Sequence, residues 1–161
     1  MIYEEEQKSP VLIWSLLAAI FIEAAALVFV FSALSDEAAR NMVMAVLGLS
    51  FAMLFFLFTQ MRTLSIRIDS HAVSFGFGFL KSSVPVGEIE KARIINFGFR
   101  NSGGWGIRYM LGGSWNWIAA WGGGVEIVTR SGKKRGFSTG NPDRVKDILN
   151  SLIPGHVTDE R

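Results

Sequence analysis

Two long apolar runs near the N-terminus constrain this chain more than any other feature. The first, Val11–Phe31, has 21 residues and one charged side chain, Glu23; the second, Met42–Met61, has no charged residue. As α-helices they would be about 31 Å and 30 Å long, close to the thickness of a bilayer's hydrocarbon core. A helix that is apolar on all sides needs a membrane or a large core, and a chain of 161 residues is too short to surround two such helices. The sequence therefore predicts a transmembrane helical hairpin.

The segments around this hairpin predict its topology. The polar connection 32–41 is short, so the two helices should be antiparallel neighbours with both chain ends on one side. The residues Glu4-Glu5-Glu6 are acidic where a signal peptide would be basic, so we expect an uncleaved anchor. The basic residues Lys8 and Arg62 flank the hairpin, and Arg40 is the one basic residue of the connection. By the positive-inside rule, both termini should be cytoplasmic in a multi-pass protein of the plasma or inner membrane.

The charge of the chain changes after the hairpin. Residues 1–61 carry two basic and six acidic side chains, a net charge of −4, whereas residues 62–161 carry 14 basic and eight acidic ones, a net charge of +6. We therefore divide the chain into residues 1–61, an N-terminal tail and hairpin with helices at about 11–31 and 42–61, and a basic domain over residues 62–161. Such a domain either faces anionic headgroups or has the ordinary charge of a cytoplasmic domain.

The second part of the chain reads as short strands followed by one helix. Apolar residues alternate with polar ones from residue 64, and segment 98–124 has nine glycines and four tryptophans. Gly112-Gly113 suits a tight hairpin turn. Asn141 and Pro142 open an amphipathic helix at about 142–153. The sequence thus predicts an α+β fold, in which roughly seven antiparallel strands form a bent sheet that the C-terminal helix covers.

The order of motifs in this domain matches a known pattern. It comprises Gly104–Arg108 (GWGIR), an aromatic strand at Trp115–Trp121, Gly124–Ile127 (GVEI) before a basic hairpin, and Ser138–Pro142 (STGNP) at the start of a helix. This order resembles that of the bacterial pleckstrin-homology-like (PH-like) domains, many of which follow two N-terminal membrane helices. The resemblance implies a seven-stranded, partly open barrel capped by the C-terminal helix, and it implies no particular activity. The phosphoinositide-binding members use a basic first hairpin, whereas this chain has Asp69-Ser70-His71 there.

Candidate binding residues lie in the glycine- and tryptophan-rich segment. Arg108 either binds an acidic group beside the exposed backbone of nearby glycines or makes a structural contact with an aromatic ring or a carboxylate. Trp105 and the three other tryptophans of this segment either form an interfacial aromatic belt or fill the core. Alternation places Trp115, Trp117 and Trp121 on one strand face, which favours packing within the core or between subunits.

Charged residues supply two further candidates. Lys133, Lys134 and Arg135 form a basic hairpin tip that either contacts anionic lipid or is solvated, and three charges are fewer than the usual lipid-binding cluster. Glu23 lies in the middle of the first apolar run, where a carboxyl group is costly and is a functional hypothesis by default. It either makes a structural contact, for example with Ser50, another copy or a partner helix, or handles protons or ions.

Enzymatic constellations are absent from the sequence. There is no cysteine, and the two histidines, His71 and His156, do not form a triad or a metal-ligand pattern. We expect no catalytic residues, cofactor, metal or nucleic acid. The sequence favours a non-enzymatic membrane protein whose PH-like domain is a binding or scaffolding module for itself, another membrane protein or the bilayer surface. The alternative is a small accessory subunit of a transport system that uses Glu23 within the bilayer.

Overall fold

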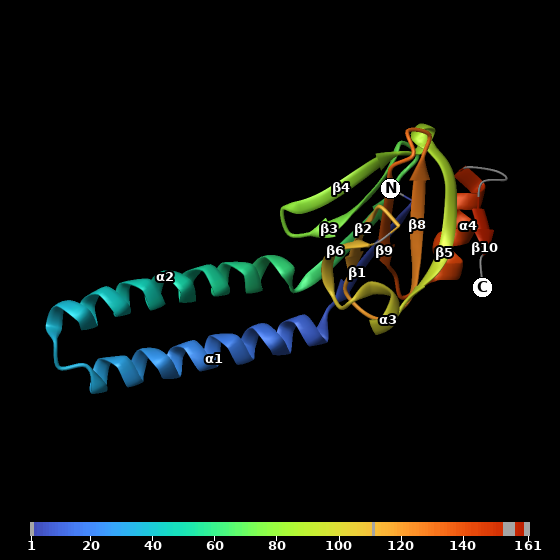
Figure 1. The fold of residues 1–161 in the computed structure, drawn as a ribbon. Helices are drawn as coiled ribbons and strands as arrows, with labels where there is room; N and C mark the ends of the chain where they lie inside the picture. Colours follow the sequence, from blue (N-terminus) through green and yellow to red (C-terminus); the bar gives the residue numbers. More distant parts are fainter. Residues whose placement is uncertain (1, 111, 153–156, 160–161) are drawn as a thin grey trace.

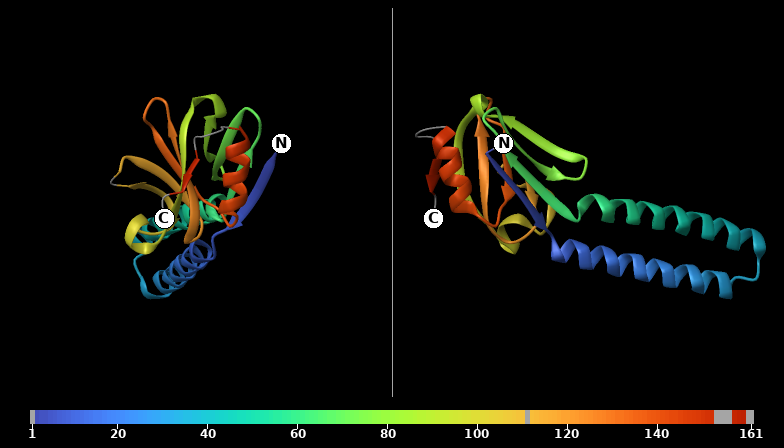
Figure 2. Two further views of the ribbon diagram at one scale, coloured as in Figure 1. Left: turned by 90° about the vertical axis from the view of Figure 1, so that its right-hand side faces the viewer. Right: turned by 180° about the vertical axis from the view of Figure 1, so that it is seen from behind.

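The computed structural model describes residues 2–110, 112–152 and 157–159 and shows a long helical hairpin that projects from a β domain (Figure 1). The hairpin consists of α1 (Pro10–Ala33) and α2 (Glu37–Met61), which lie side by side in all views (Figure 2). Both helices are long and apolar enough to cross a membrane. The predicted α+β class, with two apolar N-terminal helices and a C-terminal helix, is confirmed.

The connection between the helices is shorter than the predicted 32–41. Helix α2 begins at Glu37, five residues before the apolar run, because Asp36 is an effective N-cap. The carboxylate of Asp36 accepts hydrogen bonds from the backbone N–H groups of Ala38 and Ala39, at 2.9 and 3.3 Å. Glu37 places a second acid in the first turn, where the helix dipole favours it.

The first sheet is antiparallel and contains a strand that the sequence did not indicate. Its order is β1-β2-β3-β4, and its strands are β1 (Tyr3–Lys8), β2 (Thr63–Ile68), β3 (Ala72–Phe77) and β4 (Leu80–Pro85). Residues 3–8, expected to be a tail of the hairpin, pair with β2 over their whole length. The β domain therefore begins before α1, and the helical hairpin is inserted between its first two strands.

The second sheet has the order β10-β5-β8-β9-β7-β6 in the described part of the chain. Its strands are β5 (Ile89–Phe97), β6 (Gly106–Met110), β7 (Ser114–Ile118), β8 (Gly122–Thr129), β9 (Lys134–Ser138) and β10 (Val157–Asp159). A short 3₁₀ turn, η1 (Val86–Glu88), connects the sheets, and the one-turn helix α3 (Phe99–Ser102) follows β5. The pairs β7–β9 and β10–β5 are parallel and the others antiparallel. The C-terminal strand β10 was not expected.

Apolar side chains fill the space between the two sheets. Phe75 of β3 lies at its centre, with its ring centroid 4.6 Å from that of Phe137 and 5.2 Å from that of Trp117. Helix α4 (Pro142–Leu152) adds Val145 and Leu149, which are fully buried, from the side of β5 and β8. The predicted amphipathic stripe of this helix is confirmed, and residue 153, its predicted end, lies outside the described residues.

The two sheets do not join into a closed barrel by strand pairing; side chains bridge them along two seams. At the first seam, β1 faces the segment that leads into α4: Glu5 accepts hydrogen bonds from Tyr3 Oη (2.7 Å), Thr139 Oγ1 (2.5 Å) and the Gly140 N–H (2.8 Å). Gln7 Oε1 accepts a further bond from Ser138 Oγ at 2.7 Å. The second seam lies along β4 and is described below.

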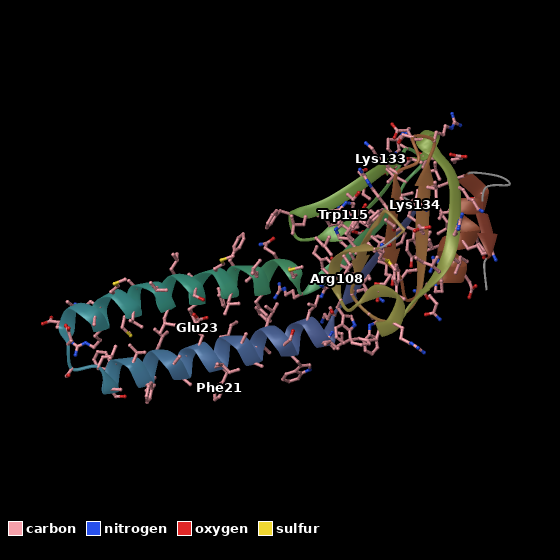
Figure 3. All side chains as sticks on the ribbon, viewed as in Figure 1. Phe21, Glu23, Arg108, Trp115, Lys133 and Lys134 are labelled. Atoms are coloured by element: carbon pink, nitrogen blue, oxygen red, sulfur yellow. The ribbon has the colours of Figure 1, made fainter. Side chains whose placement is uncertain are left out.

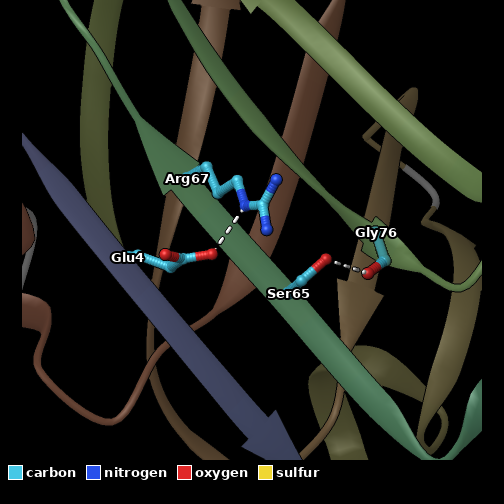
Figure 4. A network of polar contacts seen from close by, with 4 residues as sticks. All are labelled: Glu4, Ser65, Arg67 and Gly76. Atoms are coloured by element: carbon cyan, nitrogen blue, oxygen red, sulfur yellow. Dashed lines mark hydrogen bonds and ion pairs between the residues drawn. The ribbon is translucent and has the colours of Figure 1, made fainter. Parts of the chain in front are cut away.

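The outer face of the first sheet is polar, in contrast to its inner face. Glu4 and Arg67 form an exposed ion pair at 2.7 Å, and Ser65 Oγ donates to the carbonyl of Gly76 at 3.3 Å (Figure 4). Leu64, Ile66 and Ile68 alternate with these residues and are fully buried. We call the end of the domain where Lys8 and Thr63 adjoin the hairpin the helix-proximal end.

A candidate binding groove between the sheets

An open groove lies along the second seam. Its volume is about 450 Å³. It is lined by Leu80, Lys81, Ser82, Ser83, Ile107, Trp115, Trp117 and Arg135. We call it the aromatic groove. It exists because the second sheet extends past the first: β4 ends the first sheet, whereas β7 and β6 continue the second beyond it.

The strand register shows how the inner face of the second sheet becomes exposed toward the groove. One cross-strand row runs Ala92, Ile127, Arg135, Trp115 and Tyr109 from β5 to β6. Ala92 and Ile127 are fully buried, Trp115 is 49% exposed and Tyr109 is 64% exposed. The rings of Trp115 and Tyr109 contact each other, with centroids 5.2 Å apart. These two aromatic side chains thus occupy core-facing positions but have no sheet above them.

Two side chains of the second sheet bridge to β4 and form the base of the groove. The indole N–H of Trp117 donates to the carbonyl oxygen of Leu80 at 2.9 Å. Arg135 Nη1 donates to Ser82 Oγ at 2.8 Å and to the carbonyl oxygen of Ser83 at 3.1 Å. Strand β4 is the last of its sheet, so these donors satisfy carbonyl groups at its edge. The half-buried Arg135 also places a cation in the wall of the groove, which includes the apolar side chains of Ile107 and Trp115.

The tryptophans expected to share one face are divided by the structure. Trp117 is a core residue, as expected, but Trp115 is half-exposed in the groove. Strand β7 ends at Ile118, so Trp121 lies outside it and is 47% exposed. Trp121 stacks on Trp105, with centroids 4.4 Å apart, and meets Phe99 edge-on at 6.2 Å. The shared strand face is therefore confirmed for Trp115 and Trp117 and is wrong for Trp121. Packing of Trp115 within the core is not observed, and packing between subunits stays a prediction.

Arg108 makes a structural contact outside the groove. Its register partner is Asn116, on the face of β6 and β7 opposite Trp115. Arg108 Nε donates to the carbonyl oxygen of Trp105 at 3.0 Å, and its guanidinium group covers Gly104. Of the two interpretations of Arg108, these contacts support the structural one, although the contact is with a carbonyl group rather than a carboxylate or a ring.

The three basic residues of the β8–β9 hairpin do not point to one face. Lys133 is exposed at the turn, and Lys134 Nζ donates to the carbonyl oxygen of Gly112 at 3.3 Å. Arg135 points to the inner face and enters the groove, because it alternates with Lys134 along β9. The strand pleat directs Arg135 to the face opposite Lys134, whereas Lys133 and Arg135 line one small recess that also includes Glu88.

Glu23 lies on the face of α1 that is turned toward α2, and Phe21 points away (Figure 3). Glu23 is 8% exposed and is the buried residue of α1, whereas α2 has no buried residue. Ser50 is exposed on α2, and among the described residues no hydrogen bond joins it to Glu23. The position between the helices is consistent with a structural contact within the hairpin.

Other chemistries find little support in the described part of the chain. No group of three His, Asp or Glu side chains among the described residues is arranged to hold a metal ion. His71 is exposed in a turn, and its backbone N–H donates to the carboxylate of Asp69. His156 lies outside the described residues. Those backbone bonds from His71 and Ala72 lower the pKa of Asp69, which identifies a turn and not a reactive group.

No protein-family model, curated protein or solved structure matches the chain. The candidate site therefore depends on the geometry alone. Sequence reasoning had singled out Arg135 and the tryptophans but not the groove. The sequence did contain one indication of the groove. Pairing the two strands of the predicted Gly112-Gly113 hairpin places Ile107 and Tyr109 on the same face as Trp117 and Trp115.

Proposed function

We propose that this protein is an integral membrane protein whose β domain is a PH-like binding module held at the bilayer surface. The two apolar helices support the membrane assignment. Both ends of the hairpin enter the same β domain, so a spanning hairpin puts both termini on one side, and the flanking Lys8 and Arg62 favour the cytoplasm. Two sheets bridged along both seams and covered by α4 support the PH-like assignment.

The aromatic groove is the binding site in this proposal. The single observation that carries it is the uncovered inner face of β6 and β7, where Trp115 and Tyr109 are 49% and 64% exposed. Large apolar side chains at core-facing positions are normally covered, and a contiguous exposed set marks an interaction site. Tyr and Trp are also the residues that contribute most to binding in protein interfaces.

The chemistry of the groove fits an extended protein segment. The aromatic wall takes an apolar side chain, and Arg135 takes a carboxylate through a charge-assisted hydrogen bond. Strand β6 ends the second sheet in the described order, so its outer edge is free to pair with an added strand. We infer that the ligand is an extended segment of a membrane-protein partner that carries an acidic residue next to an apolar one.

The position of the β8–β9 hairpin disfavours a contact between its basic residues and lipid headgroups. Ser138, at the end of β9, bonds to Gln7 just before α1, so this end of the strand is helix-proximal. Lys134 begins the strand four residues away, about 13 Å farther from the hairpin at the usual strand rise. That separation exceeds the Debye length of about 8 Å at physiological ionic strength, so attraction to the bilayer is screened.

The test is photocrosslinking in native membranes with a benzophenone amino acid at Tyr109, whose ring contacts that of the groove residue Trp115, or at Asp147, exposed on α4. We expect the probe at position 109 to capture one protein species that position 147 does not. Arg135→Met should abolish that product because the partner's carboxylate loses its counter-ion. The matched control is Arg130→Met, which removes an exposed arginine outside the groove.

The outcomes separate the alternatives. A captured second copy of this chain identifies self-association through the groove. Capture of lipid alone at position 109 refutes the protein ligand in favour of the bilayer surface. A product that is equal at both probe positions, or that survives Arg135→Met unchanged, refutes the groove as the binding site.

A further inference from the structure

The turn between β3 and β4 carries large apolar side chains at its tip. Phe79 is 62% exposed and Leu80 is 39% exposed. Hairpin turns normally carry Gly, Asn, Asp or Ser at such positions, because their backbone and side chains face water. An exposed phenylalanine and leucine at a tip therefore indicate surroundings other than bulk water.

This tip is packed against the last turns of α2 (Figure 1). The ring of Phe79 stacks on that of Phe56, with centroids 5.9 Å apart and planes 28° apart. Gly78 has φ +49°, and a Cβ atom there would meet the backbone oxygen of Gln60 at 2.9 Å. Only glycine meets both constraints, so the turn is built to approach the helix closely.

The contact with Phe56 gives the depth of the tip relative to the helix. Phe56 lies five residues before Met61, the last residue of α2, which corresponds to about 7.5 Å along the helix axis. Above the tip, a polar recess is lined by residues that include Glu6, Arg62 and Lys81. The apolar tip is thus level with the apolar part of α2, and charged side chains lie at the level of its end.

We propose that the β3–β4 tip inserts into the boundary between headgroups and acyl chains, as a third contact of the protein with its bilayer. This inference rests on the membrane-spanning hairpin proposed above. Phe79 and Leu80 contact the upper part of the acyl chains, and Lys81 remains among the headgroups, an arrangement typical of interfacial anchors. The tip then fixes the rotation of the β domain about the hairpin.

The absence of cysteine permits a direct test with single-cysteine variants of the full chain. Phe79→Cys, Leu80→Cys, Ser83→Cys and Leu49→Cys are labelled with an environment-sensitive fluorophore and reconstituted into phosphatidylcholine–phosphatidylglycerol vesicles, with or without brominated acyl chains. Leu49 reports on the middle of α2, and Ser83 is exposed on the same hairpin as Phe79 but farther from the helix. Near-UV circular dichroism checks the fold of each variant.

We expect brominated lipid to quench the probes at 79 and 80 nearly as strongly as the probe at 49, and to leave the probe at 83 bright. If 79 and 80 behave like 83 while 49 is quenched, the hairpin spans the membrane and the inserted tip is refuted. If the probe at 49 also remains bright, the membrane assignment itself is refuted, and the inserted tip with it.

Discussion

At both seams of the β domain, side-chain hydrogen bonds join the two sheets, but only one of the seams is closed. At the first seam, strand β1 presents Glu5 and Gln7 to the segment 138–140, and α4 covers what remains open. At the second seam, Trp117 and Arg135 reach across to β4, but no helix follows among the described residues, and the second sheet extends past the first. The first seam is sealed and the second is an open groove.

This difference shows that burial in such a domain depends on what the facing sheet covers more than on residue type. Trp117 and Trp115 are two residues apart on one strand and point the same way. One is 8% exposed and the other 49%, because the first sheet covers only the former. Where the first sheet ends, core-facing side chains of the second sheet thereby line an open groove.

The largest expected effect comes from opening the sealed seam with Glu5→Ala. The substitution leaves Tyr3 Oη, Thr139 Oγ1 and the Gly140 N–H without their acceptor, and we expect the free energy of unfolding to fall by about 2–4 kcal/mol. The measurement is chemical denaturation of the full chain in detergent, followed by near-UV circular dichroism. Glu5→Gln should cost less, because its amide oxygen still accepts.

The neighbouring acid is the control for this effect. Glu4→Ala removes only the exposed ion pair with Arg67, which should cost about 0–1 kcal/mol. Equal losses for Glu4→Ala and Glu5→Ala would show that the seam is not held by the three hydrogen bonds to Glu5.

A smaller effect is expected at the open seam from Trp117→Phe. The phenyl ring keeps part of the contact with Phe75 but loses the hydrogen bond to Leu80 and some buried volume. We expect a loss of about 1–3 kcal/mol in the same denaturation measurement. Trp115→Phe should change stability by less than about 0.5 kcal/mol. A larger loss at Trp115 than at Trp117 would contradict the assignment of one to the core and the other to the groove.

The smallest effect concerns pH and again the sealed seam. Burial, followed by the hydrogen bond to Glu5 and the charge of its carboxylate, raises the pKa of Tyr3 above the ordinary value of 10.0. The folded state therefore holds this proton more tightly than the unfolded state, and its contribution to stability is complete below pH 10 and is lost as the pH rises further. The slope of the unfolding free energy above pH 10 should be shallower in Tyr3→Phe than in the wild type. Identical slopes for Tyr3→Phe and the wild type would show that ionisation of Tyr3 is not coupled to folding.

The sequence predicts those elements whose pattern is carried by apolar residues. The two helices, the α4 stripe and the turns at Gly112-Gly113 follow from periodicity and glycine chemistry. Strand β1 does not, because its inward residues are Tyr3, Glu5 and Gln7: two of the three are polar, and their role depends on partners more than 130 residues away. The groove could not be predicted either, since it depends on where the first sheet ends above the second, which no local sequence pattern records.

The joins between the helical hairpin and the first sheet also determine when that sheet can be completed during synthesis. A single residue, Ser9, separates β1 from α1, and a single residue, Arg62, separates α2 from β2; the Ser9 N–H bonds to the Arg62 carbonyl at 3.2 Å. Strand β1 leaves the ribosome first, but its partner β2 follows only after both helices have been synthesised. Lys8 meets Thr63 only when the helices lie antiparallel side by side. Completion of the first sheet thus depends on correct placement of the hairpin, and a chain with a misplaced helix keeps an unpaired, protease-accessible strand at its N-terminus.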